Sequence, residues 1–212
     1  MPYTGPHTYV TWFGDAFTAA EEWQVGIRLS TAFSVPTTTQ LEDLDAAMGA
    51  LLTSANVAFP SSRRYLGLKV APQDVNGRYP DGIDAVEYLR PAPLSGSSSG
   101  GYPQIALCLS WRTNRSRGIG SNGRMYVPSA FPIVATDGRI SSTNALAAAT
   151  AGAQFIADVR DAGLGSPAVM STVGAGRTEA ITGCRVGRVM DTQRRRRNQL
   201  AEEYTEPVAV PS

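Results

Sequence analysis

The chain has 212 residues, of which 42% are hydrophobic and 17% are charged, and its formal net charge is +1. A chain of this size buries roughly 70% of its unfolded surface, so one domain can be stable without disulfides or a structural metal. The absence of an apolar run of about 18 residues, and of signal-peptide features at the N-terminus, predicts a soluble protein that is made in a cytoplasm and has no membrane partner.

Two strands are predicted first, over residues 8–13 and 23–33. The second alternates between apolar and polar positions, as a half-buried strand does. Residues 14–22 between them predict a hairpin with a long loop. One face of the second strand is expected to carry Trp23, Val25, Ile27, Leu29, Thr31 and Phe33.

A helix is predicted over residues 39–56. Thr39 and Glu42 have the spacing of a capping box at its start. The acidic residues of the first turns lie where the helix dipole favours negative charge, so we expect a solvated polar face or, as the second possibility, a surface for arginines of another copy. The apolar face is expected to comprise Leu41, Leu44, Met48, Leu51, Leu52 and Ala55.

Strands are then predicted over 65–71, 83–90, 104–112 and 124–128. Residues 91–101, rich in Ser and Gly, predict a flexible loop. The run 104–112 has the strongest strand pattern in the chain, with large apolar residues on one face and small ones on the other.

The second helix is predicted over 142–162, with Gly163 as its C-cap. Its apolar face is expected to comprise Leu146, Ala149, Ala153, Ile156 and Ala157. The last strands are predicted over 168–173 and 180–190.

These elements predict an α+β fold, with a mainly antiparallel sheet or sandwich and two helices. We expect residues 1–190 to form a single domain with an ordered N-terminal segment. Residues 191–212 are expected to form an extended C-terminal arm, rich in arginine and then acidic.

Catalytic and metal chemistry have little support in the sequence. His7 is the only histidine, so no Ser-His-Asp or Cys-His site can form without it. Cys108 and Cys184 lack zinc-ligand spacing and are expected to be buried thiols, with one disulfide as the alternative. Residues 118–123 match G-x-G-x-x-G, but an extended run follows where a nucleotide site needs a helix, so a glycine-rich hairpin loop is favoured. We therefore expect no enzyme activity, no cofactor and no metal.

The basic residues, 18 arginines and one lysine, are unevenly distributed. Residues 1–106 have a net charge of −4, whereas residues 107–212 have a net charge of +5. The four adjacent guanidiniums of Arg194–Arg197 repel one another and need anionic partners, which are carboxylates of the same chain, carboxylates of another subunit, or phosphates.

An interface or anion-binding site is therefore predicted in two basic segments and the acidic stretch after them. An inter-subunit clamp is favoured because Glu202, Glu203 and Glu206 follow the arginine run closely. Nucleic-acid binding is the alternative, although few aromatic residues lie nearby for base stacking. The expected site residues are Arg112, Arg115, Arg117, Arg124, Arg185, Arg188, Asp191, Arg194, Arg195, Arg196, Arg197 and Tyr204.

Two stretches carry a resemblance to a known group of proteins. Residues 123–128 read GRMYVP, and residues 186–198 read VGRVMDTQRRRRN, followed by Leu200 and Tyr204. Together they resemble small virion proteins of tailed bacteriophages, and the N-terminal Trp12-Phe-Gly14 and Glu22-Trp23 are consistent with that group.

The resemblance implies a multi-copy, non-enzymatic structural component of the virion, made in the host cytoplasm. It leaves open a capsid-associated protein, a head–tail connector and a minor tail protein. The implied partners are other copies of the chain, as a homo-oligomer, and other virion proteins. The alternative from the basic segments is a nucleic-acid-binding protein.

Overall fold

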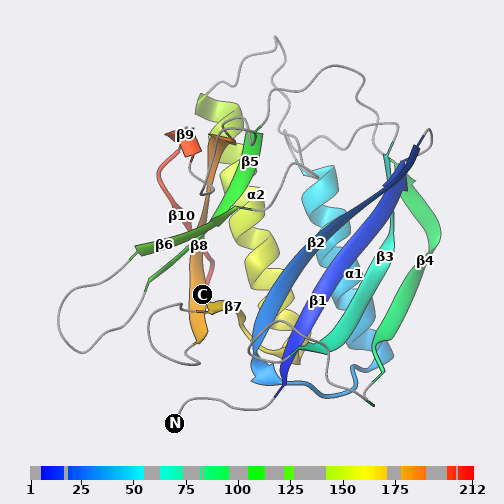
Figure 1. Ribbon diagram of the computed structural model, residues 1–212. Coiled ribbons are helices and arrows are strands. Elements are labelled where there is room, and N and C mark those ends of the chain that lie inside the picture. The colour runs from blue at the N-terminus through cyan, green and yellow to red at the C-terminus, as the bar shows by residue number, and fades with distance from the viewer. Residues whose placement is uncertain are drawn as a thin grey trace.

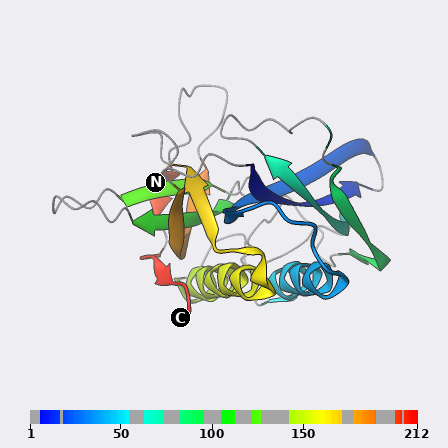
Figure 2. The same ribbon diagram turned by 90° about the horizontal axis from the view of Figure 1, so that it is seen from below.

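The computed structural model describes residues 6–16, 19–54, 63–73, 82, 84–95, 105–112, 122–126, 142–170, 178–189, 200–203 and 205–212. Within these residues the fold is α+β, as the sequence predicts, with an antiparallel sheet and two helices on one of its faces (Figures 1 and 2). No helix among them is both long and apolar enough to cross a membrane.

The sheet has the strand order β4-β3-β1-β2-β7-β8-β5-β6, and every pair is antiparallel. Two short strands, β9 and β10, also pair with β8. The strands are β1 (His7–Ala16), β2 (Ala19–Ala32), β3 (Arg63–Gln73), β4 (Val86–Ser95), β5 (Ile105–Arg112), β6 (Asn122–Tyr126), β7 (Pro167–Met170), β8 (Thr178–Val189), β9 (Leu200–Glu203) and β10 (Val208–Ala209).

The helices are α1 (Thr38–Thr53) and α2 (Ser142–Val159), and Figure 2 shows them side by side beneath the sheet. Trp12 of β1 contacts both of them. Its indole N–H donates to the carbonyl of Leu44 in α1 at 3.1 Å, and its ring packs edge-on against Phe155 of α2, with centroids 5.2 Å apart. The buried face of α2 is mostly alanine, which lets its backbone approach β8 and α1 closely.

Two β-bulges explain buried residues that are spaced by three within a strand. Leu66 is an extra residue in β3 relative to β1, and Thr182 is an extra residue in β8 relative to β5. Because side chains alternate in a strand, one extra residue returns the third position to the same face. Tyr65 therefore shares the core with Leu68, and Ile181 shares it with Cys184.

The first hairpin is tighter than expected. β1 reaches Ala16 and β2 begins at Ala19, so the long loop predicted over residues 14–22 is wrong. Of the predicted apolar face of β2, Val25, Ile27 and Leu29 are buried, whereas Thr31 is exposed and donates to the carbonyl of Leu164.

α1 is capped by a different residue from the one predicted. Its N-cap is Thr37, which forms a capping box with Gln40, so the predicted pair of Thr39 and Glu42 is wrong. Both pairs have the required spacing, but Pro36 precedes Thr37 and favours an extended chain up to the cap.

α2 ends three residues earlier than predicted, at Val159, and a π-helical turn (Arg160–Leu164) follows it. Gly163 has a φ of 77°, the left-handed conformation expected of a helix-ending glycine. Leu146 was expected in the core but is 54% exposed, because the buried face of α2 runs through Ala145, Ala148 and Ala149 instead.

One predicted loop also differs from the structure. β4 continues through Pro91 and Pro93 to Ser95, where a flexible loop was expected, and it is irregular over residues 90–93. β6 ends at Tyr126. The rest of the glycine-rich loops at 96–101 and 113–121 lies outside the described residues.

The described part of the C-terminal segment does not leave the domain as an arm. β9 and β10 return antiparallel along β8, and the amide of Val210 donates to the carbonyl of Thr182 at 3.0 Å. Val208 and Val210 also pack against the core. The short strands within residues 200–203 and 205–212 therefore lie beside β8 in the same sheet.

Candidate functional site

The two basic segments of the sequence meet on neighbouring strands. β5 pairs with β6 on one side and with β8 on the other (Figure 1). Arg112 is the register partner of Asn122, and Arg124 is the partner of Ser110. Segments that are more than fifty residues apart in the chain thus form one end of the sheet, which we call the arginine-bearing end: β5, β6 and β8.

Arg185 and Arg188 lie on β8, in different settings. Arg185 is opposite Cys108 and is only 5% exposed, so its side chain does not lie on the surface. Because side chains alternate along a strand, Arg185 lies on the face of β8 opposite to Cys184 and Val186. Arg188 is the register partner of Glu202 on β9.

The return of β9 brings acidic residues to this end of the sheet. Glu202 and Glu203 occupy the register positions opposite Arg188 and Gly187. The backbone register therefore places two acidic residues of the same chain beside β8.

The other predicted site residues lie outside the described part of the chain. They are Arg115, Arg117, Asp191, Arg194, Arg195, Arg196, Arg197 and Tyr204.

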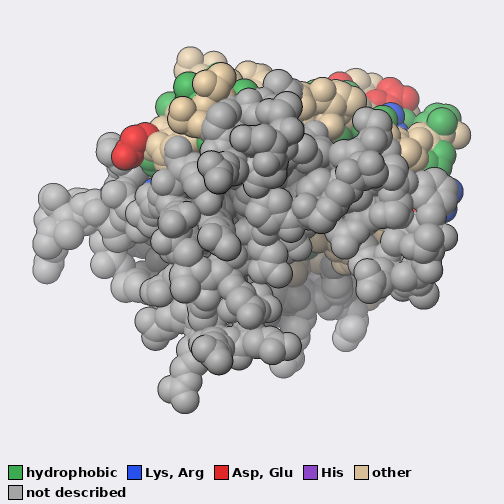
Figure 3. All heavy atoms as spheres, turned by 90° about the horizontal axis from the view of Figure 1, so that it is seen from above, with side chains coloured by type: hydrophobic (Ala, Val, Ile, Leu, Met, Phe, Trp, Pro, Cys, Tyr) green, Lys and Arg blue, Asp and Glu red, His purple; other side chains and the backbone are tan. Residues whose placement is uncertain are grey.

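Acidic side chains lie in two separate places along the coloured rim in Figure 3, so the described part of that face carries no continuous acidic patch.

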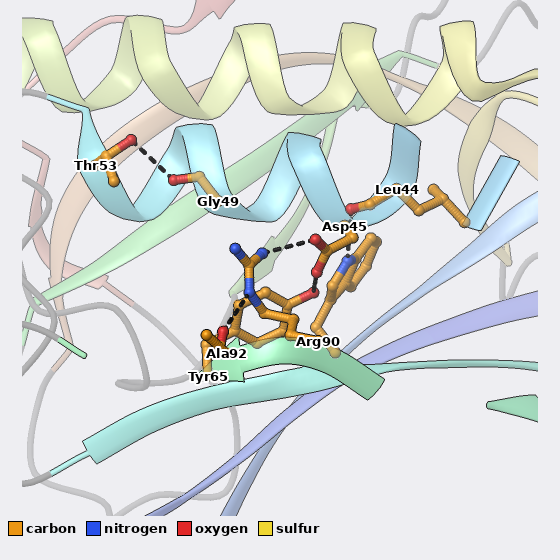
Figure 4. A network of polar contacts seen from close by, with 8 residues as sticks. Leu44, Asp45, Gly49, Thr53, Tyr65, Arg90 and Ala92 are labelled. Carbon is orange, nitrogen blue, oxygen red and sulfur yellow. Dashed lines mark hydrogen bonds and ion pairs between the residues drawn. The ribbon is translucent and has the colours of Figure 1, made fainter. Parts of the chain in front are cut away.

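A second polar cluster, which the sequence did not predict, joins α1 to the sheet (Figure 4). Asp45 of α1 is buried, and its carboxylate accepts from the hydroxyl of Tyr65 at 2.8 Å and from Arg90 at 2.7 Å. The Arg90 guanidinium also lies 5.2 Å from the centroid of the Tyr65 ring, and its Nε donates to the carbonyl of Ala92 at 3.3 Å.

Strand irregularities place these side chains together. The Leu66 bulge brings Tyr65 onto the helix-facing side of β3. In β4 the register slips between Leu89 and Leu94, and Arg90 stands at the start of this slip. Bulges commonly re-aim a side chain in this way. Gly67 allows the close strand pairing, because a Cβ there would lie 2.1 Å from the carbonyl oxygen of Tyr88.

The polar groups of this cluster are occupied by one another. Burial, and then the adjacent Asp45 carboxylate, raise the pKa of Tyr65 well above its ordinary value, so the phenol stays protonated and donates. The Asp45 carboxylate is engaged by two donors, which leaves it poorly suited to abstract a proton from a substrate. The arrangement holds α1 on β3 and β4.

The sequence contained a signal for this cluster. Asp45 lies four residues after Leu41 and three before Met48, so it falls inside the apolar stripe of α1 and not on the polar face with Glu42 and Asp43. A charged residue inside an apolar stripe needs a buried partner. That partner could not be identified, because the register slip that brings Arg90 to it depends on strand pairing.

Among the described residues, no group of three His, Cys, Asp or Glu side chains is arranged to hold a metal ion. Cys184 is fully buried. Comparisons with protein-family models, with curated proteins and with solved structures gave no match to this chain.

Proposed function

We propose that the chain is a non-enzymatic structural component of a tailed-phage virion, which assembles through inter-subunit contacts with Arg194–Arg197 as a clamp. One observation carries the proposal: two basic segments distant in sequence lie on the neighbouring strands β5, β6 and β8 at one end of the sheet. Basic segments on adjacent strands favour an anionic partner, such as the acidic surface of a neighbouring subunit.

The polar clusters of the described residues also favour assembly over chemistry. The Asp45 cluster is satisfied internally, and the ion pair of Asp15 with Arg64 links β1 to β3. The Asp15 carboxylate joins two strands, and the Asp45 carboxylate joins α1 to β3 and β4. The sequence resemblance suggests that the domain binds its partners in a virion.

The proposal is tested by neutralising the clamp. Arg194–Arg197 are replaced by four glutamines, and incorporation of the variant into particles of the phage that encodes it is measured by mass spectrometry of purified virions. We expect incorporation to fall at least tenfold, because the acids of the neighbouring subunit lose their partners. The isolated variant should keep its melting temperature within about 2 °C.

The matched control replaces the same four arginines by lysines, which keeps the charge but removes the planar, bidentate fork. Partial recovery of incorporation supports a clamp by charge, and full loss supports bidentate pairing. Normal incorporation of the glutamine variant would rule out the clamp.

Nucleic-acid binding is the second candidate, because Arg112 of β5 and Arg124 of β6 lie on adjacent strands at neighbouring register positions. If phosphates are the partner, the affinity for a random DNA duplex should fall steeply with salt, by several log units per log unit of salt concentration. A flat response, or no binding at low salt, would remove this candidate and leave the protein clamp in place.

A further inference from the structure

The sheet consists of two half-sheets that follow the order of the chain. Strands from residues 6–95 form β4-β3-β1-β2, and strands from residues 105–189 form β7-β8-β5-β6. The half-sheets meet at β2 and β7, which share two register pairs. Beside these pairs the amide of Ser30 donates to the carbonyl of Ser166 at 2.9 Å. A short antiparallel contact is thus enough to continue the sheet from one half to the other.

Both half-sheets have the same arrangement of strands. Each ends in the second of two consecutive paired strands, β2 in the first half and β6 in the second. The strand before it, β1 or β5, pairs on its other side with a strand that follows the helix, β3 or β8. The fourth strand is β4 in one half and β7 in the other. At the two ends of the sheet, β6 and β4 therefore occupy the positions that β2 and β7 occupy at its centre.

The directions of the two end strands allow the sheet to continue into a second copy. Within the described part of the chain, β4 pairs only with β3, and β6 pairs only with β5 (Figure 1). The path from β4 to β6 has eight strands with every adjacent pair antiparallel, so its two end strands run in opposite directions. A second copy in the same orientation therefore brings its β4 antiparallel to β6 of the first, with the helices of both on one face.

The edge strand β4 carries an exposed apolar residue. Val86 and Tyr88 pack against the core, so Glu87 and Leu89 lie on the face away from the helices. Leu89 is 63% exposed. Exposed apolar residues on an edge strand favour pairing with another chain.

The lengths of the two end strands also match. The part of β4 before its prolines, residues 86–90, has five residues, and β6 (Asn122–Tyr126) has five residues and no proline. Proline lacks the amide that a strand ladder needs, so regular pairing of β4 is confined to this part.

Opposite charge favours β6, and not a second β4, as the partner of β4. Residues 1–106, which include the first half-sheet, have a net charge of −4, and residues 107–212 have a net charge of +5. A contact between two β4 edges or two β6 edges brings like-charged halves together, whereas a contact of β4 with β6 brings oppositely charged halves together.

We propose that copies of this chain associate head to tail, with β4 of one copy pairing as an antiparallel strand with β6 of the next. A contact between two different edges leaves one edge of each kind free, so it repeats from copy to copy into a ring or a filament. The inference rests on the proposed multi-copy function and names the strands that join the copies.

Charge also selects the register of this contact. Position 124 lies on the same face as Glu87, because its register partner Ser110 follows Leu109, which pairs with the core residue Cys184. Opposite charges at facing positions stabilise antiparallel pairing, so Glu87 is expected opposite Arg124. This register puts Leu89 opposite Asn122.

A disulfide tests the contact directly, because facing residues of antiparallel strands are close enough to form one. Full-length Leu89→Cys chains are mixed with full-length Asn122→Cys chains, oxidised and separated on a non-reducing gel. We expect a disulfide-linked dimer from the mixture and none from either variant alone. Mixing Asn122→Cys chains with unaltered chains controls for Cys108 and Cys184, and mixing them with Thr53→Cys chains controls for random collision. A dimer from Leu89→Cys chains alone would show a β4–β4 contact and overturn the proposal.

Substitutions at the exposed leucine test the charge selection. Leu89→Lys and Leu89→Glu both remove the apolar side chain, but lysine places a positive charge against the basic half of the next copy. We expect the lysine variant to associate about tenfold more weakly than the glutamate variant in sedimentation velocity runs. Leu146→Lys, at the 54% exposed leucine of α2, is the matched control and should associate like the unaltered chain. Equal association of the two Leu89 variants would overturn the proposal.

Phage particles separate this contact from the proposed function. Particles are prepared from a phage that encodes the Leu89→Cys/Asn122→Cys double variant and are then oxidised. A chain that is present in purified particles without disulfide-linked multimers would overturn the contact and leave the proposed function standing. Multimers in solution from a chain that is absent from particles would support the contact and overturn the proposed function.

Discussion

The Oδ2 atom of Asp45 accepts a hydrogen bond from Nη1 of Arg90 at 2.7 Å, and this contact ties α1 to the edge strand β4. β4 pairs on one side only among the described residues, so its position depends on β3 and on this ion pair. Since Tyr65 donates to the other carboxylate oxygen, a single aspartate joins a helix to two adjacent strands.

Replacing Asp45 by alanine should destabilise the fold by about 2–4 kcal/mol, because the Arg90 charge and the Tyr65 hydroxyl are left without their buried acceptor. Urea unfolding monitored by circular dichroism measures this change. Asp43→Ala on the exposed face of the same helix is the matched control, expected within about 0.5 kcal/mol of the unaltered chain. Equal effects at both positions would contradict the buried role of Asp45.

Two glycines should respond in opposite directions to alanine. At Gly67 an added methyl would lie 2.1 Å from the carbonyl oxygen of Tyr88, so Gly67→Ala should force β3 and β4 apart and cost at least about 2 kcal/mol. At Gly49 in α1 the nearest atom would be Arg90 Nη1 at 3.6 Å, an ordinary contact. Gly49→Ala should therefore stabilise the chain by about 0.5–1 kcal/mol. Thermal unfolding of both variants measures the contrast, and destabilisation by Gly49→Ala would contradict it.

The helix cap gives a similar contrast between neighbouring threonines. Thr37→Ala removes the side chain that accepts from the amide of Gln40 and should cost about 1 kcal/mol. Thr39→Ala, at the second residue of the helix, should be neutral or slightly stabilising because alanine is the better helix former. Chemical denaturation of the two variants distinguishes the observed cap from the one that the sequence pattern favoured.

The sequence predicted what depends on local periodicity. The alternation in β2 and the heptad-like spacing in α1 specified which faces are buried, and both helices and the antiparallel sheet were confirmed. It missed features that depend on register between strands. The spacing of three between Tyr65 and Leu68 looks irregular until the Leu66 bulge is known, and Leu66 is an extra residue only relative to β1.

The candidate site shows the same limit. Composition predicted that the basic segments have a shared function, but only the pairing of β5 with β8 brings them to one end of the sheet. The burial of Arg185 was not predictable, because an alternating strand with one polar residue usually exposes it. The return of the chain at β10 was also missed, since two valines spaced by two within a Pro-containing tail make a weak strand pattern.

The single histidine makes the pH dependence of stability simple to assign. His7 is fully buried at the start of β1, and burial, followed by the nearby Arg28 guanidinium, lowers its pKa from 6.5. Above pH 6.5 the imidazole is neutral in both states. As the pH falls below 6.5, the unfolded chain takes up a proton that the folded chain resists, so the free energy of unfolding should decrease until the folded pKa is passed.

Urea unfolding at several pH values between 5 and 8 measures this slope. His7→Gln should flatten it, whatever its effect on stability at pH 8, because no other histidine can titrate in this window. The Arg64 guanidinium lowers the pKa of Asp15 below 3.8, so the contribution of that ion pair is lost only in more acidic solution and does not overlap. An unchanged slope in the variant would mean that a group other than His7 controls stability between pH 5 and 6.5.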